Sequence, residues 1–145
     1  MSNHTIRVLV ALVAIPLILL LTLAGGFYFF FLVAVISGFA LHEFYALTKA
    51  RGALPQTVLG LFFGLCVNLV FMHDRLQSLV VGILAGFGID VPFPSMAQLF
   101  LILLLLFVPT ILMVELLRGT GSSLFNVAAT LFGVCYVSFL LGCFI

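Results

Sequence analysis

The sequence predicts an all-α, polytopic membrane helix bundle, and two observations carry the prediction. Hydrophobic residues make up 66% of the 145 residues and charged residues only 6%, with a mean hydropathy of +1.49, whereas a soluble domain carries about 25% charged residues. The few charges leave long uncharged runs, among them 35 residues over 8–42 and 27 residues over 119–145. Because a spanning helix needs about 20 apolar residues, these runs predict several spans.

The remaining composition excludes other classes of protein. A net charge of +1 provides no basic surface for nucleic acid. The three cysteines, Cys66, Cys135 and Cys143, lie in apolar segments without the spacing of metal ligands, so we expect buried thiols that act as small hydrophobic side chains. No linker or repeat divides the chain, and residues 1–145 are predicted to form a single transmembrane domain.

The uncharged runs and their breaks predict five helices, at about 5–23, 27–48, 56–72, 96–117 and from 124 onward. The first run is too long for one span and breaks at Gly25-Gly26, where a turn with positive φ costs little. The polar stretch 49–55 separates the second helix from the third. The cluster 73–75 is expected to end the third helix, and the loop 118–123 separates the last two.

The segment 76–94 is the ambiguous part of the chain. Its uncharged run covers only 14 residues and contains three glycines, so we expect an interfacial or re-entrant segment. In that case four basic residues share one side and only Arg75 lies on the other; the four are Arg7, Lys49, Arg51 and Arg118. The positive-inside rule then places the N-terminus in the cytoplasm. If 76–94 crosses, the chain has six spans and Arg118 moves outside.

Small residues recur at helical spacing on several predicted helices. One strip consists of Gly60, Gly64 and Asn68. A second consists of Asn126, Ala129-Thr130 and Gly133, and the doubtful segment carries Gly82 and Gly86. Such strips allow close helix packing, which we expect of the first two, whereas Gly82 and Gly86 fit a short irregular insert equally well. A binding cleft or a homodimer seam is the alternative.

Arg118 and the loop after it form a weak candidate phosphate contact. Hydroxyls and free backbone N–H groups at a helix start suit an anion. A positive-inside anchor with a helix-capping loop is the simpler interpretation, and Glu115 is expected to pair with Arg118 across one turn. His73-Asp74 is expected to be a polar helix end rather than a metal site, since adjacent side chains on a helix point in different directions.

Glu43 lies near the end of the second helix, where the predicted topology places the cytoplasmic interface. Lys49 and Arg51 follow within one to two turns, and Tyr45 is a residue type common at membrane interfaces. We therefore expect Glu43 to anchor the helix end rather than to act in catalysis.

Several of these residues, taken in order, carry a resemblance to a known family. They are Arg7, Ala11-Leu12, Pro16-Leu17, the Gly25-Gly26 turn, Glu43-Phe44-Tyr45 before Gly52, and the later segment 126–142 with its Gly-x-x-Tyr pattern. In this order and spacing, the chain resembles the N-terminal region of bacterial phosphatidate cytidylyltransferases, also called CDP-diacylglycerol synthases. Residues from about 73 to 100 do not contribute to the resemblance.

The resemblance implies an Mg²⁺-dependent enzyme of the bacterial cytoplasmic membrane that condenses CTP with phosphatidate and releases pyrophosphate. The family's hallmark, a Ser-x-x-Lys-Arg element followed by Lys-Asp and His-Gly-Gly-x-x-Asp-Arg, does not occur in this sequence. The four acidic residues are at least 16 positions apart, whereas nucleotidyl transfer needs carboxylates that hold Mg²⁺ together. We expect the N-terminal portion of a longer enzyme, inactive by itself, with catalytic residues and Mg²⁺ ligands outside this chain.

Two other functions stay open at this point. The first is a non-enzymatic polytopic membrane protein, such as a small transporter or an assembly subunit. A transport path usually needs polar or ionisable groups at the middle of the membrane, and the first, second and last helices contain almost none. The second is another lipid-modifying enzyme, for which only the loop 118–123 could hold a headgroup motif.

Overall fold

The computed structural model describes residues 3–88, 92–119 and 122–145, with side chains for Val8 and from Ala11 onward in these ranges. Asp90, Thr120-Gly121 and the side chain of Arg7 lie outside the described residues. The elements, in chain order, are α1 (Asn3–Ala24), α2 (Gly26–Ala50), α3 (Thr57–Phe71), α4 (His73–Gly86), α5 (Met96–Arg118), α6 (Ser123–Gly133), the π-helix η1 (Val134–Ser138) and α7 (Phe139–Gly142). The predicted all-α fold is confirmed, and the five predicted helices match α1, α2, α3, α5 and the continuous run α6–η1–α7.

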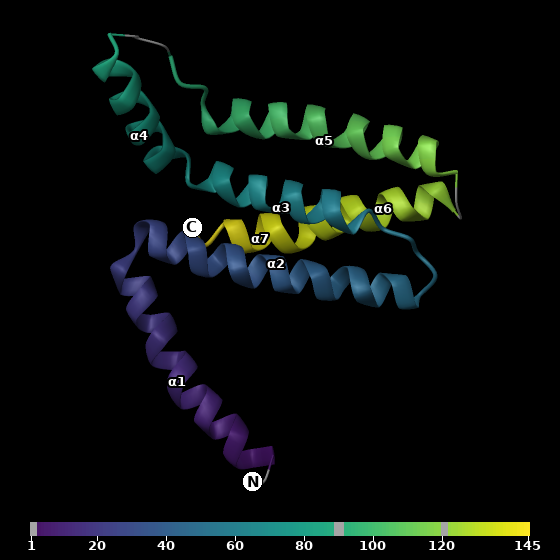
Figure 1. The fold of residues 1–145 in the computed structure, drawn as a ribbon, viewed down its shortest axis with the longest axis horizontal. Helices are drawn as coiled ribbons and strands as arrows, with labels where there is room; N and C mark the ends of the chain where they lie inside the picture. The colour runs from purple at the N-terminus through teal and green to yellow at the C-terminus, as the bar shows by residue number, and fades with distance from the viewer. Residues whose placement is uncertain (1–2, 89–91, 120–121) are drawn as a thin grey trace.

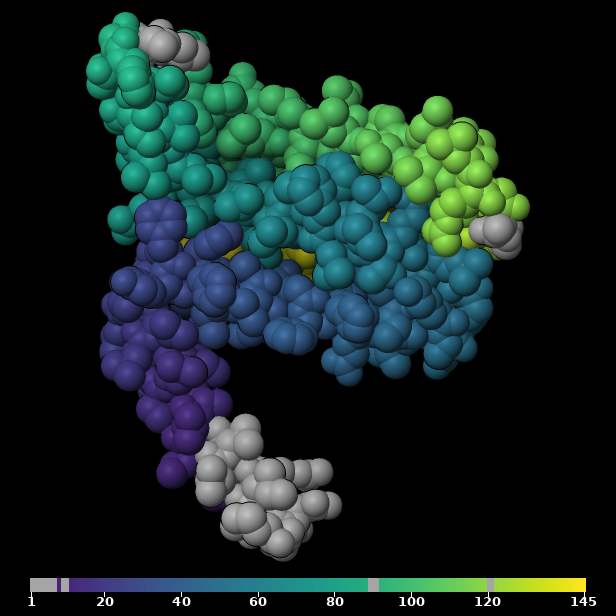
Figure 2. Space-filling view, in the orientation of Figure 1, coloured from purple at the N-terminus to yellow at the C-terminus, as the bar shows by residue number. Residues whose placement is uncertain are grey.

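The bundle consists of α2, α3, α5 and the run α6–η1–α7, which lie side by side, while α1 and α4 project away from it (Figure 1). Figure 2 shows α3 in contact with α2 on one side and α5 on the other. Within the described residues, α2, α5 and Ser123–Gly142 are long and apolar enough to cross a membrane, and the bent pair α3–α4 would be a fourth span if it crosses as one. The chain is therefore a membrane helix bundle, while five spans stays a prediction.

The bend between α3 and α4 adds a helix that the sequence did not predict. The third helix ends before the cluster 73–75, as predicted, but His73, Asp74 and Arg75 also begin a further helix, α4, which turns from α3 by 79°. No residue of α4 is buried, and a Cβ added at Gly82 or Gly86 would meet nothing within 4 Å. The small residues of this segment therefore have no packing partner within the described residues. A short helix without buried residues agrees with the expectation of an interfacial or re-entrant segment.

The boundaries of α5 have local causes. Ser95 and Gln98 form a capping box, in which the Gln98 backbone N–H donates to Ser95 Oγ at 3.3 Å and the Ser95 N–H donates to Gln98 Oε1 at 2.8 Å. Gly119 ends the helix with φ of 56°, a left-handed conformation that glycine adopts without strain.

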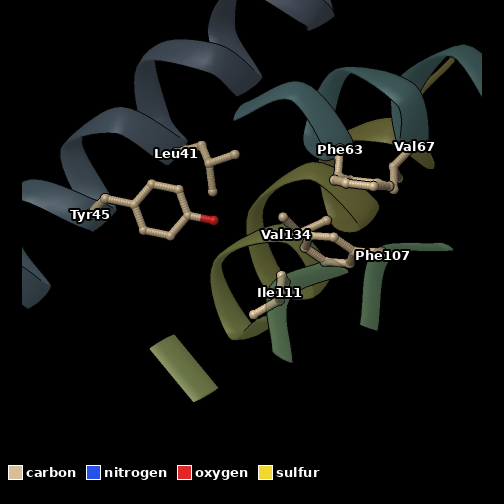
Figure 3. Close-up of a cluster of buried hydrophobic side chains, with 7 residues drawn as sticks. All are labelled: Leu41, Tyr45, Phe63, Val67, Phe107, Ile111 and Val134. Carbon is tan, nitrogen blue, oxygen red and sulfur yellow. The ribbon is translucent and has the colours of Figure 1, made fainter. Parts of the chain in front are cut away.

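A cluster of buried apolar side chains joins the bundle helices (Figure 3); it consists of Leu41, Tyr45, Phe63, Val67, Phe107, Ile111 and Val134. Tyr45 has no exposed surface, so its expected place at the membrane interface was wrong. Its ring lies where α2 meets Gly60 of α3 and Gly133 of α6: a Cβ at Gly60 would collide with the ring, and one at Gly133 would lie 2.6 Å from Tyr45 Cε1. The packing roles predicted for the small-residue strips of α3 and α6 are confirmed.

The π turn η1 keeps one face of the last helix in the core. A π turn holds roughly one residue more than an α turn. As a result Ser138 and Gly142 continue the buried face that Thr130 and Val134 begin. In an unbroken α-helix, Val137 would instead turn toward the core. Ser138 Oγ then lies 3.2 Å from Ser37 Oγ of α2. The thiols of Cys135 and Cys143 face outward, contrary to the expectation of burial.

Candidate functional site

Buried polar residues gather at the end of the bundle where α2 and α5 finish and α3 and α6 begin. This polar cluster consists of Gln56, Glu115, Asn126 and Thr130, each at most 6% exposed. Its residues come from the α2–α3 connection, the last turn of α5 and the first two turns of α6. Because buried polar groups need partners inside a membrane protein, the hydrogen bonds of this cluster decide what it can do.

Glu115 is the centre of the polar cluster. Its Oε1 accepts a hydrogen bond of 2.6 Å from Asn126 Nδ2, and its Oε2 accepts one of 3.0 Å from Gln56 Nε2. Arg118 Nη1 lies 3.8 Å from the same Oε2. A buried carboxylate is costly unless it is paired and hydrogen-bonded, and here two amide donors and one guanidinium offset that cost.

The α2–α3 connection is held to α6 through its backbone. The Leu54 N–H donates to Asn126 Oδ1 at 2.6 Å, and the Gln56 N–H donates to Thr130 Oγ1 at 2.9 Å. The Tyr45 hydroxyl donates to the Thr130 carbonyl at 2.9 Å. These bonds satisfy irregular backbone that could not face lipid unpaired, so the polar cluster locks a non-helical connection against two helices.

The hydrogen bonds of the polar cluster limit the chemistry that it can perform. Each oxygen of Glu115 accepts one hydrogen bond from an amide of the protein, so the carboxylate is held in place by Gln56 and Asn126. The described ranges contain no group of three or more His, Cys, Asp or Glu side chains that could hold a metal ion. These hydrogen bonds join the α2–α3 connection, α5 and α6, as a structural clamp would.

Arg118, the predicted phosphate contact, turns toward the α2–α3 connection. Its Nη1 donates to the Leu54 carbonyl at 3.2 Å, and the predicted pairing with Glu115 is confirmed. Ser122, at the N-cap of α6, makes no side-chain capping bond. The role of Arg118 as a phosphate contact stays a prediction.

The residues that carry the family resemblance occupy different environments. Gly25 and Gly26 form the turn between α1 and α2 with φ of 60° and 55°, as their sequence predicts. Phe44 packs edge-on against Tyr45, with ring centroids 5.8 Å apart. Glu43 is exposed, and among the described residues no hydrogen bond or ion pair involves its carboxylate. The predicted anchoring role therefore finds no partner within the chain and would depend on the membrane interface.

A second buried polar group lies deeper in the bundle. Asn68 is 1% exposed, and neither its amide oxygen nor its amide nitrogen has a hydrogen-bond partner in the described part of the chain. It lies one turn beyond Gly64, whose added Cβ would be 2.5 Å from Ser138 Oγ. Asn68 therefore forms no side-chain hydrogen bond between helices within the residues that the structure describes.

The opposite end of the bundle carries the histidine pair. His73 Nδ1 lies 3.0 Å from Asp74 Oδ1, and Nε2 lies 2.8 Å from the Pro94 carbonyl oxygen. Two acceptors facing the two ring nitrogens favour the doubly protonated ring. The pair joins α4 to the start of α5 and has no third acidic, histidine or cysteine ligand among the described residues, as expected of a polar helix end.

Gln56 is the member of the polar cluster that the sequence analysis did not predict. Its signal is the local pattern Pro55-Gln56-Thr57, a helix start with one amide between otherwise apolar runs. Comparison with known proteins adds no assignment: no family model matches the chain, and neither a curated protein nor a solved structure matches it.

Proposed function

We propose that this chain is the N-terminal membrane part of a phosphatidate cytidylyltransferase, which forms CDP-diacylglycerol and pyrophosphate from CTP and phosphatidate. The observation that carries the proposal is the place of the resembling residues in the fold. Gly25-Gly26 forms the α1–α2 turn, and Tyr45 fills the space that Gly60 and Gly133 leave open. Gly25-Gly26 and Tyr45, which are among the residues that carry the resemblance, are thus ones on which the fold of this chain depends.

The part that this chain plays in such an enzyme is a scaffold. Nucleotidyl transfer needs carboxylates around Mg²⁺ and cations against the triphosphate. Glu115 is held by two amide donors, Glu43 is exposed, and Asp74 lies in the first turn of α4, where it lines a hollow with Gly26. Catalytic groups and Mg²⁺ ligands therefore belong to a segment beyond these 145 residues, and the polar cluster keeps the helices that support it in register.

The proposed location is the bacterial cytoplasmic membrane with the N-terminus in the cytoplasm. This orientation places the polar cluster, Lys49, Arg51 and Arg118 on the side where CTP is available. The small-residue faces of α3 and α6 are filled by side chains of the same chain, so the homodimer, which stays a prediction, would need another surface.

One observation favours a second function. The unpartnered Asn68 inside the bundle is a polar group at membrane depth, as a transport path or a subunit contact would require. A small transporter or an assembly subunit is therefore the rival proposal. The buried Ser37 and Ser138 are neutral and bonded to each other, which gives this function less support.

Two measurements distinguish these proposals. In a reconstituted membrane with CTP, Mg²⁺ and phosphatidate, the 145-residue chain should form no CDP-diacylglycerol, and activity of the chain alone would contradict the scaffold role. The gene should continue past Ile145 into a segment with Lys-Asp and His-Gly-Gly-x-x-Asp-Arg elements. A stop codon directly after Ile145, with a stable and functional product, would remove the synthase proposal.

A further inference from the structure

One face of α2 carries exposed residues at the spacing of a helix–helix contact. They are Ile36, Phe39, Glu43, Ala46 and Ala50, and each is exposed. Their separations alternate between three and four residues, as those of the a and d positions of a heptad do. α2 lies at one edge of the bundle, and α1 joins it at its first residues, before this face begins (Figure 1). This α2 seam is therefore open to a further helix.

Glu43 is the charged residue of the α2 seam, and the described part of the chain gives its carboxylate no partner. Lys49 follows six positions later, which places it about 9 Å further along the axis and on another side of the helix. The residues one turn before and after Glu43 on the seam side are apolar: Phe39 is 74% exposed and Leu47 is 63% exposed. A carboxylate among lipid-facing apolar side chains is costly without a partner. The seam therefore requires a partner that brings a hydrogen-bond donor or a cation to this depth.

A second copy of the chain supplies such a group from the same face of α2. Copies that share one orientation in the membrane bring their α2 helices together in parallel, with equal positions at equal depth. His42 is exposed and lies one residue, about 1.5 Å along the axis, from Glu43. In a parallel pair, a side chain at an a position inserts among four residues of the facing helix, and the preceding g position is one of them. Glu43 of each copy thus meets His42 of the other, and the twofold axis makes the contact twice.

The rest of the α2 seam suits a close approach of two helices. Ala46 and Ala50 lie four residues apart toward the end of α2, and small residues at this spacing let two backbones come together. Ile36 and Phe39 provide apolar contacts before Glu43. The two imidazoles lie beside the two carboxylates and offset the repulsion between them.

We propose that α2 pairs with α2 of a second copy along this seam, with two His42–Glu43 contacts across the twofold axis. A second copy is favoured over an unrelated partner because His42 and Glu43 are complementary to each other and lie at nearly the same depth. The small-residue faces of α3 and α6 are filled within the chain, whereas the α2 seam is free. The interface goes beyond the proposed function and does not rest on it.

Association is measured by energy transfer between donor-tagged and acceptor-tagged copies of the full chain in phosphatidylcholine vesicles. Transfer should rise with the protein-to-lipid ratio to the plateau of a pair, because association follows mass action. Dilution into detergent micelles separates the copies for the same reason, so unfolding in dilute micelles reports on the single chain. Transfer that stays at the level of random encounters at every ratio would overturn the proposal.

His42→Leu tests the donor side of the contact. It removes the imidazole from both contacts and should raise the protein-to-lipid ratio at half-maximal transfer about tenfold. Asp74→Lys is the control for a changed charge, because it alters an exposed carboxylate on α4, and it should shift this ratio less than about twofold. An unchanged ratio for His42→Leu would contradict the pairing.

Glu43→Lys tests the acid side and makes the same change of charge as the control. Two copies of this variant bring cations together and should associate at least about tenfold more weakly than the wild type. A mixture of the variant with the wild type brings the introduced lysine to a carboxylate and should associate within about threefold of the wild-type pair. Self-association of the variant at the wild-type level, or a mixture no stronger than the variant by itself, would refute the seam.

Disulfide formation locates the contact independently of charge. Ala46 and Ala128 are exposed alanines of α2 and α6 at similar depth, since Tyr45, next to Ala46, bonds to the Thr130 carbonyl. Ala46→Cys should form a disulfide-linked pair on oxidation, because its position faces the same position of the second copy. Ala128→Cys should give no more cross-linked pair than the native thiols of the wild type. Equal cross-linking at the two positions would overturn the proposal, and none of these results depends on whether the chain belongs to a nucleotidyltransferase.

Discussion

Replacing Glu115 by Gln tests the structural clamp with almost no change of shape. In the wild-type chain both carboxylate oxygens face amide donors, at 2.6 Å from Asn126 and 3.0 Å from Gln56. A glutamine at this position has one oxygen and one NH₂ group. Whichever way its amide is turned, the NH₂ group faces another donor, and one hydrogen bond is lost.

The size of the effect follows from these contacts. Loss of a hydrogen bond to a charged group costs about 1.5–3 kcal/mol. The contact with Arg118, at 3.8 Å and with the arginine 37% exposed, adds less than about 1 kcal/mol. Glu115→Gln should therefore lower the free energy of unfolding by about 2–4 kcal/mol.

A second substitution should restore much of this loss. In Glu115→Gln with Asn126→Asp, the NH₂ group of the introduced glutamine donates to the new carboxylate, while the glutamine oxygen still accepts from Gln56. The carboxylate at position 126 also keeps an oxygen for the Leu54 N–H, which the asparagine oxygen accepts at 2.6 Å. Asn126→Asp alone places two carboxylates together and should cost more than the pair, so the cycle yields a coupling energy of about 2 kcal/mol or more.

The assay is reversible unfolding in mixed micelles, followed by far-ultraviolet circular dichroism. Glu43→Gln is the control, because the exposed Glu43 carboxylate has no partner in the described residues, and it should stay within about 0.5 kcal/mol of the wild type. If Glu115→Gln is as mild as this control, or if the double variant is no more stable than Asn126→Asp, the clamp is refuted.

Three further predictions follow from the packing and the hydrogen bonds. Gly60→Ala should cost about 1–3 kcal/mol because its Cβ meets the Tyr45 ring, whereas Gly38→Ala, with nothing within 4 Å of its Cβ, should be neutral or stabilising; equal thermal midpoints would contradict the packing. Tyr45→Phe, which removes a buried hydrogen bond, should cost about 1 kcal/mol, and an unchanged unfolding free energy would show that this bond contributes nothing. Hydrogen bonding to Asp74, and then to a backbone carbonyl, raises the pKa of His73. The stabilisation that the protonated His73 gives to the folded chain should be complete below about pH 6.5 and lost as the pH rises through the raised pKa. Hydrogen-exchange protection of α4 should therefore be higher at low pH, and a difference that persists in His73→Gln would exclude the histidine as its cause.

The helices were predictable because their cause is local. Uncharged runs of spanning length, the diglycine at 25–26 and the polar stretches are all visible in the sequence, and α2, α3 and α5 begin and end within a few residues of the expected positions. The packing role of Gly60 could also be predicted, because small residues at spacing four share one helix face. The helix α4 that begins at His73 was missed; the bond of His73 to the Pro94 carbonyl, 21 positions away, is tertiary and cannot be predicted from spacing.

The polar cluster could be predicted only in part. The Glu115–Arg118 contact is local, at a separation of three residues, and was expected. Gln56 reaches Glu115 across 59 positions, and such a pairing follows from the way α3 packs on α5 rather than from spacing. Tyr45 was misplaced for the same reason. A tyrosine near a helix end resembles an interface residue until Gly60 and Gly133 are known to face it.

Joint activity of two halves tests the central claim most directly. The proposal expects a catalytic segment encoded after this chain; the two are produced as separate polypeptides in one membrane, and CTP-dependent formation of CDP-diacylglycerol is then measured. The account predicts activity only when both halves are present, and a reduced amount of complex with Glu115→Gln in the first half. Activity from either half alone, or a stable complex of the two halves without activity, would contradict it.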